Sequence, residues 1–153
     1  MSELTALYQE IILDHNKRPR NRGMLAEANR SAQGDNPLCG DKVKVWLEVE
    51  GERVKGVSFE GQGCAISISS ASIMTEAVQG KTLAEVQALF REFHALLTGD
   101  PSVPAEASPH LGKLAVFSGV REYPVRVKCA TLAWHTLQAA LKSGAASGAV
   151  TTE

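Results

Sequence analysis

An alternation of apolar and polar residues between positions 43 and 60 constrains the fold of this sequence more than any other feature. Apolar side chains occupy every second position of the first run: Val43, Val45, Leu47 and Val49. Because successive side chains of a strand point to opposite faces, this spacing predicts a strand with one buried face. Gly51 and Glu52 supply a turn before a second run, Val54 to Glu60, so the two strands are expected to pair as an antiparallel hairpin. Arg30 to Gly34 is a weaker candidate for a third strand.

Helical patterns lie on both sides of this hairpin. Apolar residues recur at helical spacing from Leu4 to Ile12, and small residues fill a second segment from Ala65 to Val78. Thr82 and Glu85 have the spacing of a capping box, and they precede an apolar stripe that ends at Leu97. These patterns predict at least three amphipathic or buried helices in addition to the hairpin.

The C-terminal third of the chain is less regular. Gly99 to Pro109 is rich in proline and is expected to be irregular, and a short helix is expected from Leu111 to Ser118. A last helix is expected from Pro124 to Leu141, since proline is tolerated in the first turn. The sequence thus predicts a single α+β domain at residues 1–142, with a small antiparallel β-sheet of about three strands packed against helices, and a flexible C-terminal tail at 143–153.

The composition excludes several classes of function. The chain has 153 residues, with 16 Lys+Arg against 17 Asp+Glu and a formal net charge of -1. It therefore lacks the basic surface that sequence-independent nucleic-acid binding requires. The longest apolar stretch, 65–78, is interrupted by polar residues and is shorter than the roughly 20 residues that span a bilayer. Because the N-terminus also lacks the pattern of a signal peptide, we expect a cytoplasmic protein with no nucleic-acid or membrane partner, in which cysteines remain thiols.

Three cysteines carry the candidate chemistry. Cys39 lies before the first predicted strand of the hairpin, Cys64 follows the glycine-rich turn at 61–63, and Cys129 lies early in the last helix. Each is expected where the chain changes direction rather than in an ordinary core, and flanking glycines and a helix N-terminus favour an outward-pointing thiolate. Thiolate is the form that binds metal and attacks electrophiles. The alternative is that free cysteines are commonly small buried hydrophobes.

The spacing of the cysteines excludes a local zinc knuckle, because the chain has no Cys-x-x-Cys pair. A metal site must therefore be assembled by the fold. Asp41, two residues after Cys39, can complete three thiolates to the four ligands that zinc prefers, or it can be an aspartate that stabilises its own turn. Arg126 and Lys128 can offset the negative charge of such a site, or they can be two solvated charges at a helix start.

The histidines do not add to this constellation. The chain has four of them, His15, His94, His110 and His135. None has metal-like spacing, and we interpret most of them as surface or packing residues, with His15 on the polar side of the first helix. A Gly-x-Ser-x-Gly elbow and a phosphate-binding glycine loop are both absent from the sequence, which disfavours hydrolase and nucleotide-binding functions.

Three segments carry a resemblance to a known family. Residues 34–41, 61–67 and 126–132 each contain one cysteine and resemble the three cysteine motifs of the iron-sulfur assembly proteins of the IscU/SufU family. Asp14-His15 and the loop after the first helix are also similar to that family. Lys128 stands where scaffold-type members have histidine, the region 99–109 resembles the insertion of the SufU branch, and the chaperone-recognition motif Leu-Pro-Pro-Val-Lys has no counterpart.

The resemblance implies a SufE/IscU-like fold and a zinc-dependent sulfur carrier for iron-sulfur cluster assembly. It implies Zn2+ held by residues matching Cys39, Asp41, Cys64 and Cys129. Sulfur would be accepted as a persulfide on Cys39 from a SufS-like cysteine desulfurase, and downstream cluster-assembly proteins would receive it. Two alternatives stay open: a non-enzymatic scaffold that assembles a [2Fe-2S] cluster from iron on the same cysteines, and a purely structural zinc module.

Overall fold

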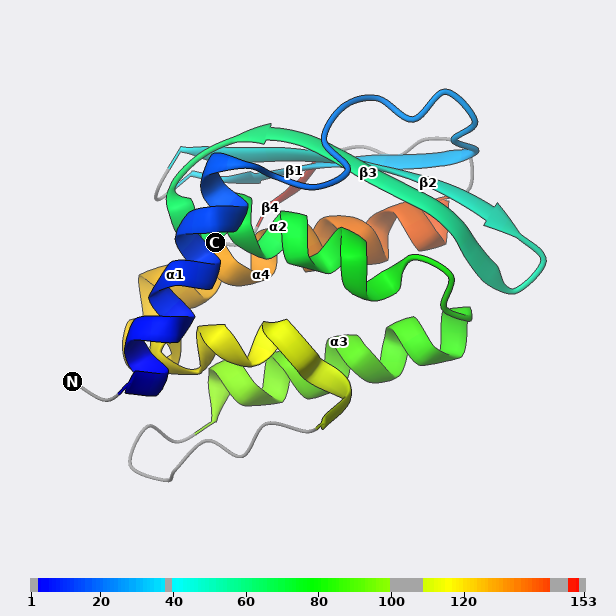
Figure 1. Cartoon of the computed structure of the whole chain (residues 1–153). Helices are drawn as coiled ribbons and strands as arrows, with labels where there is room; N and C mark the ends of the chain where they lie inside the picture. The colour runs from blue at the N-terminus through cyan, green and yellow to red at the C-terminus, as the bar shows by residue number, and fades with distance from the viewer. Residues whose placement is uncertain (1–2, 38–39, 100–108, 144–148, 152–153) are drawn as a thin grey trace.

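The computed structural model describes residues 3–37, 40–99, 109–143 and 149–151. A sheet covered on one face by helices forms the body of the molecule (Figure 1). In chain order the elements are α1 (Glu3–Lys17), β1 (Arg30–Asn36), β2 (Asp41–Glu50), β3 (Arg53–Gln62), α2 (Ala65–Val78), α3 (Leu83–Thr98), the 3-10 helix η1 (Pro109–Glu122), α4 (Pro124–Ser143) and β4 (Ala149–Thr151). The α+β architecture predicted from the sequence is confirmed.

The hairpin forms as its alternation predicts. Strands β2 and β3 pair antiparallel around the turn at Gly51, whose φ of 63° is the left-handed conformation that glycine adopts without strain. The apolar positions of β2 are buried and the intervening ones are more exposed. The weaker candidate strand also forms, since β1 pairs antiparallel with β2. A short parallel strand that the sequence did not indicate, β4, pairs with β1 at residues 149–151, so the sheet order is β3-β2-β1-β4.

The helices form two layers beneath the sheet. Figure 1 shows α2 and α4 directly under the strands, α3 and η1 below them, and α1 across one end. The core between these layers is apolar, and its largest fully buried side chains include Trp134, Phe59, Phe93, Phe117, Leu47 and Met74. Helix α2 is buried almost all round, including Ser67, Ser69, Ser70 and Ser72. Small side chains at these positions let α2 pack closely against neighbours on several sides.

A capping box in the sequence determines where α3 begins. The Thr82 hydroxyl accepts a hydrogen bond from the backbone N–H of Glu85 at 3.1 Å, and the Glu85 carboxylate accepts one from the N–H of Thr82 at 3.0 Å. These two bonds satisfy N–H groups that have no partner within the helix. The predicted capping box is therefore confirmed. The irregular region expected at 99–109 lies largely outside the described residues.

Two sequence expectations about α1 differ from the structure. Leu7, which shares the apolar stripe of this helix, is 50% exposed, and His15, expected on the polar side, is only 1% exposed. The polar side of α1 near its C-terminus is covered by α2, which the periodicity of α1 alone does not reveal.

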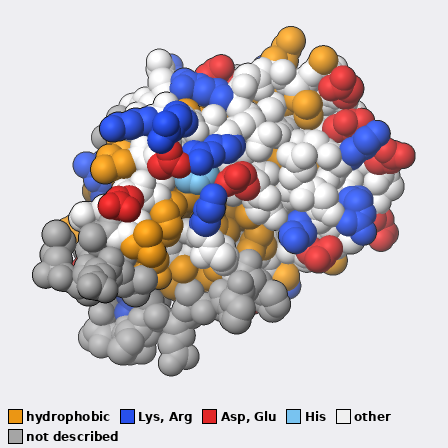
Figure 2. All heavy atoms as spheres, viewed as in Figure 1, with side chains coloured by type: hydrophobic (Ala, Val, Ile, Leu, Met, Phe, Trp, Pro, Cys, Tyr) orange, Lys and Arg blue, Asp and Glu red, His pale blue; other side chains and the backbone are white. Residues whose placement is uncertain are grey.

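The surface carries charges of both signs. Figure 2 shows basic and acidic side chains interspersed on one face, as expected from a net charge of -1. Within the described residues, none of the helices combines the length and the apolar character needed to cross a membrane.

Close approach between β1 and α4 positions the C-terminal helix on the sheet. Gly34 in β1 lies directly over α4, and a Cβ placed on it would be 2.2 Å from the Thr136 Oγ1 and 3.2 Å from the Leu132 Cδ1. Only a residue without a side chain fits there. Because α4 also carries Cys129, this contact fixes where that thiol lies relative to the sheet.

We expect Gly34→Ala to lower the free energy of unfolding by about 1–3 kcal/mol, because the added methyl group forces α4 away from β1. Adding Thr136→Ala in the same chain should recover part of this loss by removing the nearest atom. Urea unfolding of the single and double variants measures both effects. Gly119→Ala is the matched control, since a Cβ there meets nothing within 4 Å. Equal stability of the Gly34 and Gly119 variants would contradict the packing argument.

Candidate metal centre

Asp41, Cys64 and Cys129 come together at one end of the sheet. Their ligand atoms all lie within 4.8 Å of one another. Asp41 is the first residue of β2, Cys64 is the N-cap residue of α2, and Cys129 lies in the second turn of α4. Residues that are distant in sequence therefore converge on one point, as the sequence analysis required of a metal site. Within the described part of the chain, this is the single group of three or more potential metal ligands.

A bond between Asp41 and the backbone of Cys64 holds two of these residues in place. The Asp41 Oδ1 accepts a hydrogen bond from the Cys64 N–H at 3.0 Å, and the Cys64 thiol donates to the Oδ2 at 3.9 Å. Asp41 is 1% exposed, so this carboxylate is buried, whereas Cys64 is only partly buried. Neither sequence-based alternative described this contact, in which Asp41 links the start of β2 to the start of α2.

The glycine before Cys64 makes room for this carboxylate. A Cβ on Gly63 would lie 2.3 Å from the Asp41 Oδ1 and 2.8 Å from its Cγ. The φ of Gly63 is outside the left-handed region, so the backbone itself tolerates other residues. The need for glycine at this position is therefore the space occupied by Asp41.

Cys129 differs from the expectation that its setting would be unlike a core thiol. It is completely buried within α4 and does not lie at a change of chain direction. Asn36, the last residue of β1 and also fully buried, points its amide at this thiol, with 3.8 Å between the Asn36 Nδ2 and the Cys129 Sγ. The burial arises because α4 packs its first turns against β1, which brings the thiol beneath the end of the strand.

Cys39 lies outside the described residues, but the elements on either side of it are defined. Asn36 at the end of β1 and Asp41 at the start of β2 are paired residues of the antiparallel ladder. The Gly40 N–H donates to the Asn36 carbonyl at 2.8 Å, and Gly40 has a φ of 72°. The described residues before and after Cys39 are thus held together at the end of the sheet where Asp41 lies.

The basic residues near Cys129 have different settings. Lys128 is half-buried, whereas Arg126, one turn before Cys129, is exposed. Arg126 lines a groove of about 540 Å³ together with Tyr8 and Ile66. Ile66 lies two residues after Cys64 in the chain, but neither Cys64 nor Cys129 is among the residues that line the groove. Because Cys64 is partly exposed and Cys129 is not, the cluster is approached from the Cys64 side.

This donor set fits a zinc ion. Two thiolates and a carboxylate are among the ligands that zinc prefers, and Zn–S bonds of about 2.3 Å place tetrahedral donors about 3.5–3.8 Å apart. The observed separations, up to 4.8 Å, differ from this geometry by small side-chain movements. The N-terminus of α2 also points backbone N–H groups toward the cluster, and its dipole favours negative charge there.

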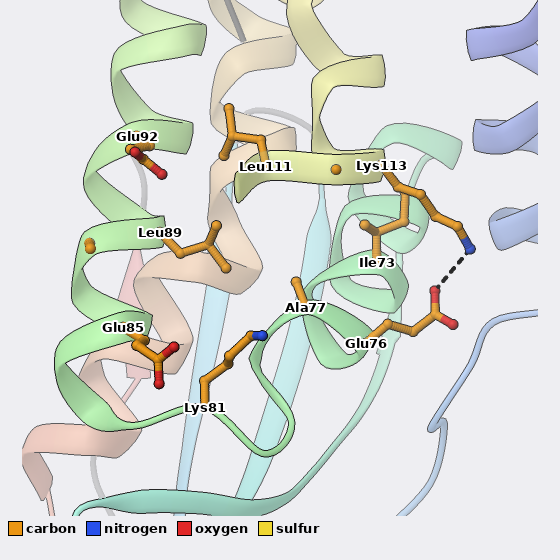
Figure 3. Close-up of a pocket in the computed structure, with 11 residues that line it drawn as sticks. Ile73, Glu76, Ala77, Lys81, Glu85, Leu89, Glu92, Leu111 and Lys113 are labelled. Carbon is orange, nitrogen blue, oxygen red and sulfur yellow. Dashed lines mark hydrogen bonds and ion pairs between the residues drawn. The ribbon is translucent and has the colours of Figure 1, made fainter. Parts of the chain in front are cut away.

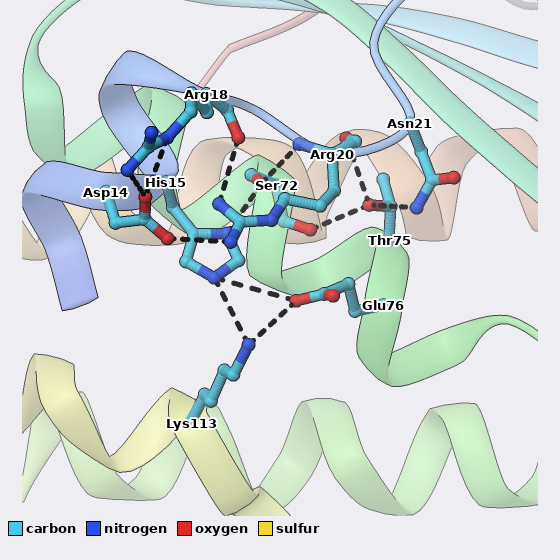
Figure 4. Close-up of polar contacts among 9 residues, drawn as sticks. All are labelled: Asp14, His15, Arg18, Arg20, Asn21, Ser72, Thr75, Glu76 and Lys113. Carbon is cyan, nitrogen blue, oxygen red and sulfur yellow. Dashed lines mark hydrogen bonds and ion pairs between the residues drawn. The ribbon is translucent and has the colours of Figure 1, made fainter.

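A second polar cluster surrounds His15 (Figure 4). The His15 Nδ1 lies 2.7 Å from the Ser72 Oγ, and that oxygen also accepts the Arg20 backbone N–H at 2.8 Å. The His15 Nε2 faces Glu76 at 3.6 Å and the Lys113 Nζ at 3.5 Å. The network therefore joins α1, the loop after it, α2 and η1. Its sequence signal is the run of buried serines in α2, which need polar partners from neighbouring elements.

His15 is neutral in this setting. Burial is the largest effect that lowers the pKa of His15, and the positive charges of Arg20 and Lys113 lower it further, while Glu76 and Asp14 act in the opposite direction. A neutral ring with its proton on Nδ1 donates to Ser72 and accepts from the Lys113 ammonium at Nε2. Asp14 is held by Arg20 and Arg18, which lower its pKa to about 2. We therefore interpret the His15–Glu76 contact as a close approach and not as an ion pair.

A cavity of about 660 Å³ between α2, α3 and η1 lies away from the thiols (Figure 3). Its floor is apolar and includes Ile73 and Leu89. Two of its carboxylates already have partners, since Glu76 pairs with Lys113 at 3.3 Å and Glu85 closes the capping box. Among the described residues, the lining contains neither thiol nor imidazole, so it offers no acceptor for sulfur.

We expect Gly63→Ala to reduce the affinity for Zn2+ about 10- to 100-fold, as is typical when the support of a metal ligand is lost. The added methyl group displaces the Asp41 carboxylate from the N–H of Cys64. Competition with a chromophoric zinc chelator measures this affinity. Gly119→Ala again serves as the control, because it adds the same methyl group in open space. Unchanged zinc affinity of the Gly63 variant would remove Asp41 from the metal site.

Stability should fall as the pH is lowered from 8 to 5.5. Because the pKa of His15 is lowered on folding, the unfolded chain takes up a proton below about pH 6.5 that the folded chain does not, so the stabilisation by neutral His15 is complete above that pH and declines below it. The pKa of His135 is lowered in the same direction by burial and by His94. Asp14, whose pKa is about 2, changes the stability only at much lower pH.

Urea unfolding across this pH range tests the assignment to His15. His15→Gln should show a smaller loss of stability on acidification than the unmodified protein. His135→Gln measures how much of that loss comes from His135. An unchanged pH slope in His15→Gln would show that this ring does not titrate between the folded and unfolded states as described.

Residues 7–130 match the family described as the NifU-like N terminal domain. The Bacillus subtilis (strain 168) protein named zinc-dependent sulfurtransferase SufU is 36% identical over 137 residues, which cover 90% of each chain. The Streptococcus pyogenes serotype M1 protein named iron-sulfur cluster assembly scaffold protein IscU is 37% identical over 145 residues, which cover 95% of this chain and 89% of that protein.

Solved structures show the same fold. The crystal structure of FiSufU from Fervidobacterium islandicum AW-1 has a TM-score of 0.80 at 36% identity, covering 90% of this chain and 98% of that one. The N-terminal part of a NifU-like protein from Brucella abortus has a TM-score of 0.79 at 26% identity, covering 92% and 96%. On its sequence and its fold, the chain belongs to the NifU-like N-terminal domain family of iron-sulfur cluster assembly proteins, together with SufU and IscU.

Proposed function

We propose that this protein is a zinc-dependent persulfide carrier that accepts sulfur from a cysteine desulfurase for iron-sulfur cluster assembly. The observation that carries the proposal is the convergence of Asp41, Cys64 and Cys129 within 4.8 Å. Cys39 is proposed as the fourth ligand and as the sulfur acceptor. The similarity to a relative named zinc-dependent sulfurtransferase supports the same function.

The proposed ligands divide into fixed and exchangeable groups. Asp41, Cys64 and Cys129 belong to a strand, a helix cap and a helix, so the fold holds them whether or not the fourth ligand is present. Zinc, when bound, keeps thiolates together without redox chemistry of its own. Lys128 and Arg126 are proposed to offset the negative charge of three thiolates and one carboxylate.

Sulfur transfer to Cys39 is a thiol exchange in which atoms and electrons balance. The Cys39 thiolate attacks the outer sulfur of the persulfide on the desulfurase cysteine. The sulfur-sulfur bond of the donor breaks, a new one forms on Cys39, and the donor cysteine leaves as a thiolate. No external oxidant or reductant is needed, because the transferred sulfur keeps its oxidation state.

The proposed partner is a SufS-like cysteine desulfurase, and later cluster-assembly proteins are the proposed recipients. The partly exposed Cys64 gives a partner access to the metal ligands. We place the reaction in the cytoplasm, since its reducing conditions keep three cysteines as thiols.

A scaffold that assembles a [2Fe-2S] cluster is the second candidate. It is favoured by the 37% identity to a protein named as an IscU scaffold. The two functions differ in metal content. Protein isolated without oxygen should contain stoichiometric zinc if it is the carrier. Stoichiometric iron and sulfide, with visible absorption and no zinc, would favour the scaffold.

Desulfurase turnover tests the carrier directly. Adding the zinc-loaded protein to a SufS-like desulfurase with cysteine should increase the turnover rate, and Cys39→Ala should reduce the increase to background because no thiolate accepts the sulfur. Mass spectrometry of the protein should show one added sulfur on the unmodified chain and none on the variant.

Two controls make this result specific. Circular dichroism should show that Cys39→Ala remains folded, and Thr98→Ala, on α3 and outside the thiol cluster, should retain the full rate increase. Undiminished sulfur uptake by Cys39→Ala would end the assignment of this cysteine. If chelation of zinc unfolds the domain and the desulfurase shows no rate increase, the metal site is only structural.

A further inference from the structure

We infer that Asn36 is a positioning residue of the metal centre, which donates an amide hydrogen bond to the Cys129 sulfur and keeps that thiolate as a permanent ligand. The inference rests on the proposed metal-binding function and concerns a residue outside the proposed ligand set. Its basis is the placement of a buried amide donor beside a buried thiol.

The contact between these residues is enclosed on all sides. Asn36 and Cys129 each have 0% exposure, and 3.8 Å separates the Asn36 Nδ2 from the Cys129 Sγ, within the range for hydrogen bonds to sulfur. Water therefore does not compete for the amide. In such an environment a hydrogen bond to an anion is stronger than in water, and a thiolate with no donor nearby is costly to bury.

The backbone fixes the direction of the amide. Asn36 is the last residue of β1, its carbonyl accepts the Gly40 N–H at 2.8 Å, and its Cα pairs with that of Asp41. Two residues earlier, Gly34 lies against α4, the helix that carries Cys129. The strand end and the helix are thus held together, and the amide of Asn36 reaches the Cys129 sulfur in this arrangement.

The two described thiols therefore have different surroundings. Cys64 is partly exposed, and its sulfur faces the Asp41 carboxylate at 3.9 Å, which accepts hydrogen bonds. Cys129 is buried and faces an N–H donor. A donated hydrogen bond withdraws electron density from sulfur, so it lowers the reactivity of a thiolate toward electrophiles. Of the two described cysteines, Cys129 is accordingly the one less suited to leave the metal and accept sulfur.

Cobalt substitution gives a readout that a merely structural role would not change. The Co2+-loaded protein should show thiolate-to-cobalt charge-transfer absorption in the near ultraviolet. Asn36→Leu keeps a similar volume but removes the N–H, so the sulfur lone pairs rise in energy and this absorption should shift to longer wavelength. Asn36→Asp, which replaces the donor with an anionic oxygen, should shift it in the same direction.

Asn29→Leu is the matched control. The side-chain amide of Asn29 also bonds to a strand, since its Nδ2 donates to the Val49 carbonyl at 2.8 Å and its Oδ1 accepts the Val49 N–H at 2.9 Å. The loss of these bonds should lower stability without moving the charge-transfer absorption. An identical absorption maximum in the unmodified protein and in both Asn36 variants would overturn the inference while leaving the metal site intact.

A measurement on the unmodified protein decides the question if the Asn36 variants do not fold. With 113Cd2+ bound, a hydrogen bond from the amide to a metal-bound sulfur should produce scalar coupling between the metal and the Asn36 Nδ2–H. Absence of this coupling in a fully loaded protein would overturn the role of Asn36. Absence of any thiolate-to-metal absorption in the unmodified protein would instead reject the proposed metal site, and the inference with it.

Discussion

The hydrogen bond between the Asp41 carboxylate and the backbone of Cys64 is the contact on which the rest of the site depends. Antiparallel pairing of β2 with β3 puts the start of β2 and the end of β3 at the same end of the sheet. The chain then enters α2 within a few residues, so Asp41 and Cys64 meet through local topology. The third side chain, Cys129, is positioned in another way, by the packing of α4 on β1. Two contacts of different origin thus create one donor cluster.

The network around His15 stabilises the second half of α2, the helix whose N-cap residue is Cys64. Helix α2 carries Cys64 at its N-terminus and Ser72 and Glu76 further along, where they meet His15 and Lys113. A helix whose polar groups are satisfied from α1 and η1 has little freedom to shift. The position of the thiol at its N-terminus therefore depends partly on a polar cluster that takes no part in binding metal.

Much of the fold follows from local patterns, and the exceptions have a common cause. The hairpin, α2 and the capping box at Thr82 were predicted because turn chemistry and periodicity act within a few residues. The burial of His15 and of Cys129 was not, because it is decided by elements that are distant in sequence, α2 for His15 and β1 for Cys129. The short strand at 149–151 depends likewise on an available edge of β1. The flexibility expected for residues 143–153 stays a prediction.

For the candidate site as well, the sequence indicates which residues take part but not how they are arranged in space. The sequence motifs pointed to the cysteines and Asp41, but they could not distinguish a metal-binding aspartate from one that stabilises a turn. In the structure, the Asp41 Oδ1 accepts the backbone N–H of Cys64, and its Oδ2 faces the Cys64 thiol. A ligand that is to be chemically modified must be one whose departure leaves the others in place. Under the proposed function that ligand is Cys39, because the elements that carry Asp41, Cys64 and Cys129 keep these three residues together without it. In this proposal, regular elements that hold three of the ligands allow the metal site to persist while the fourth ligand reacts.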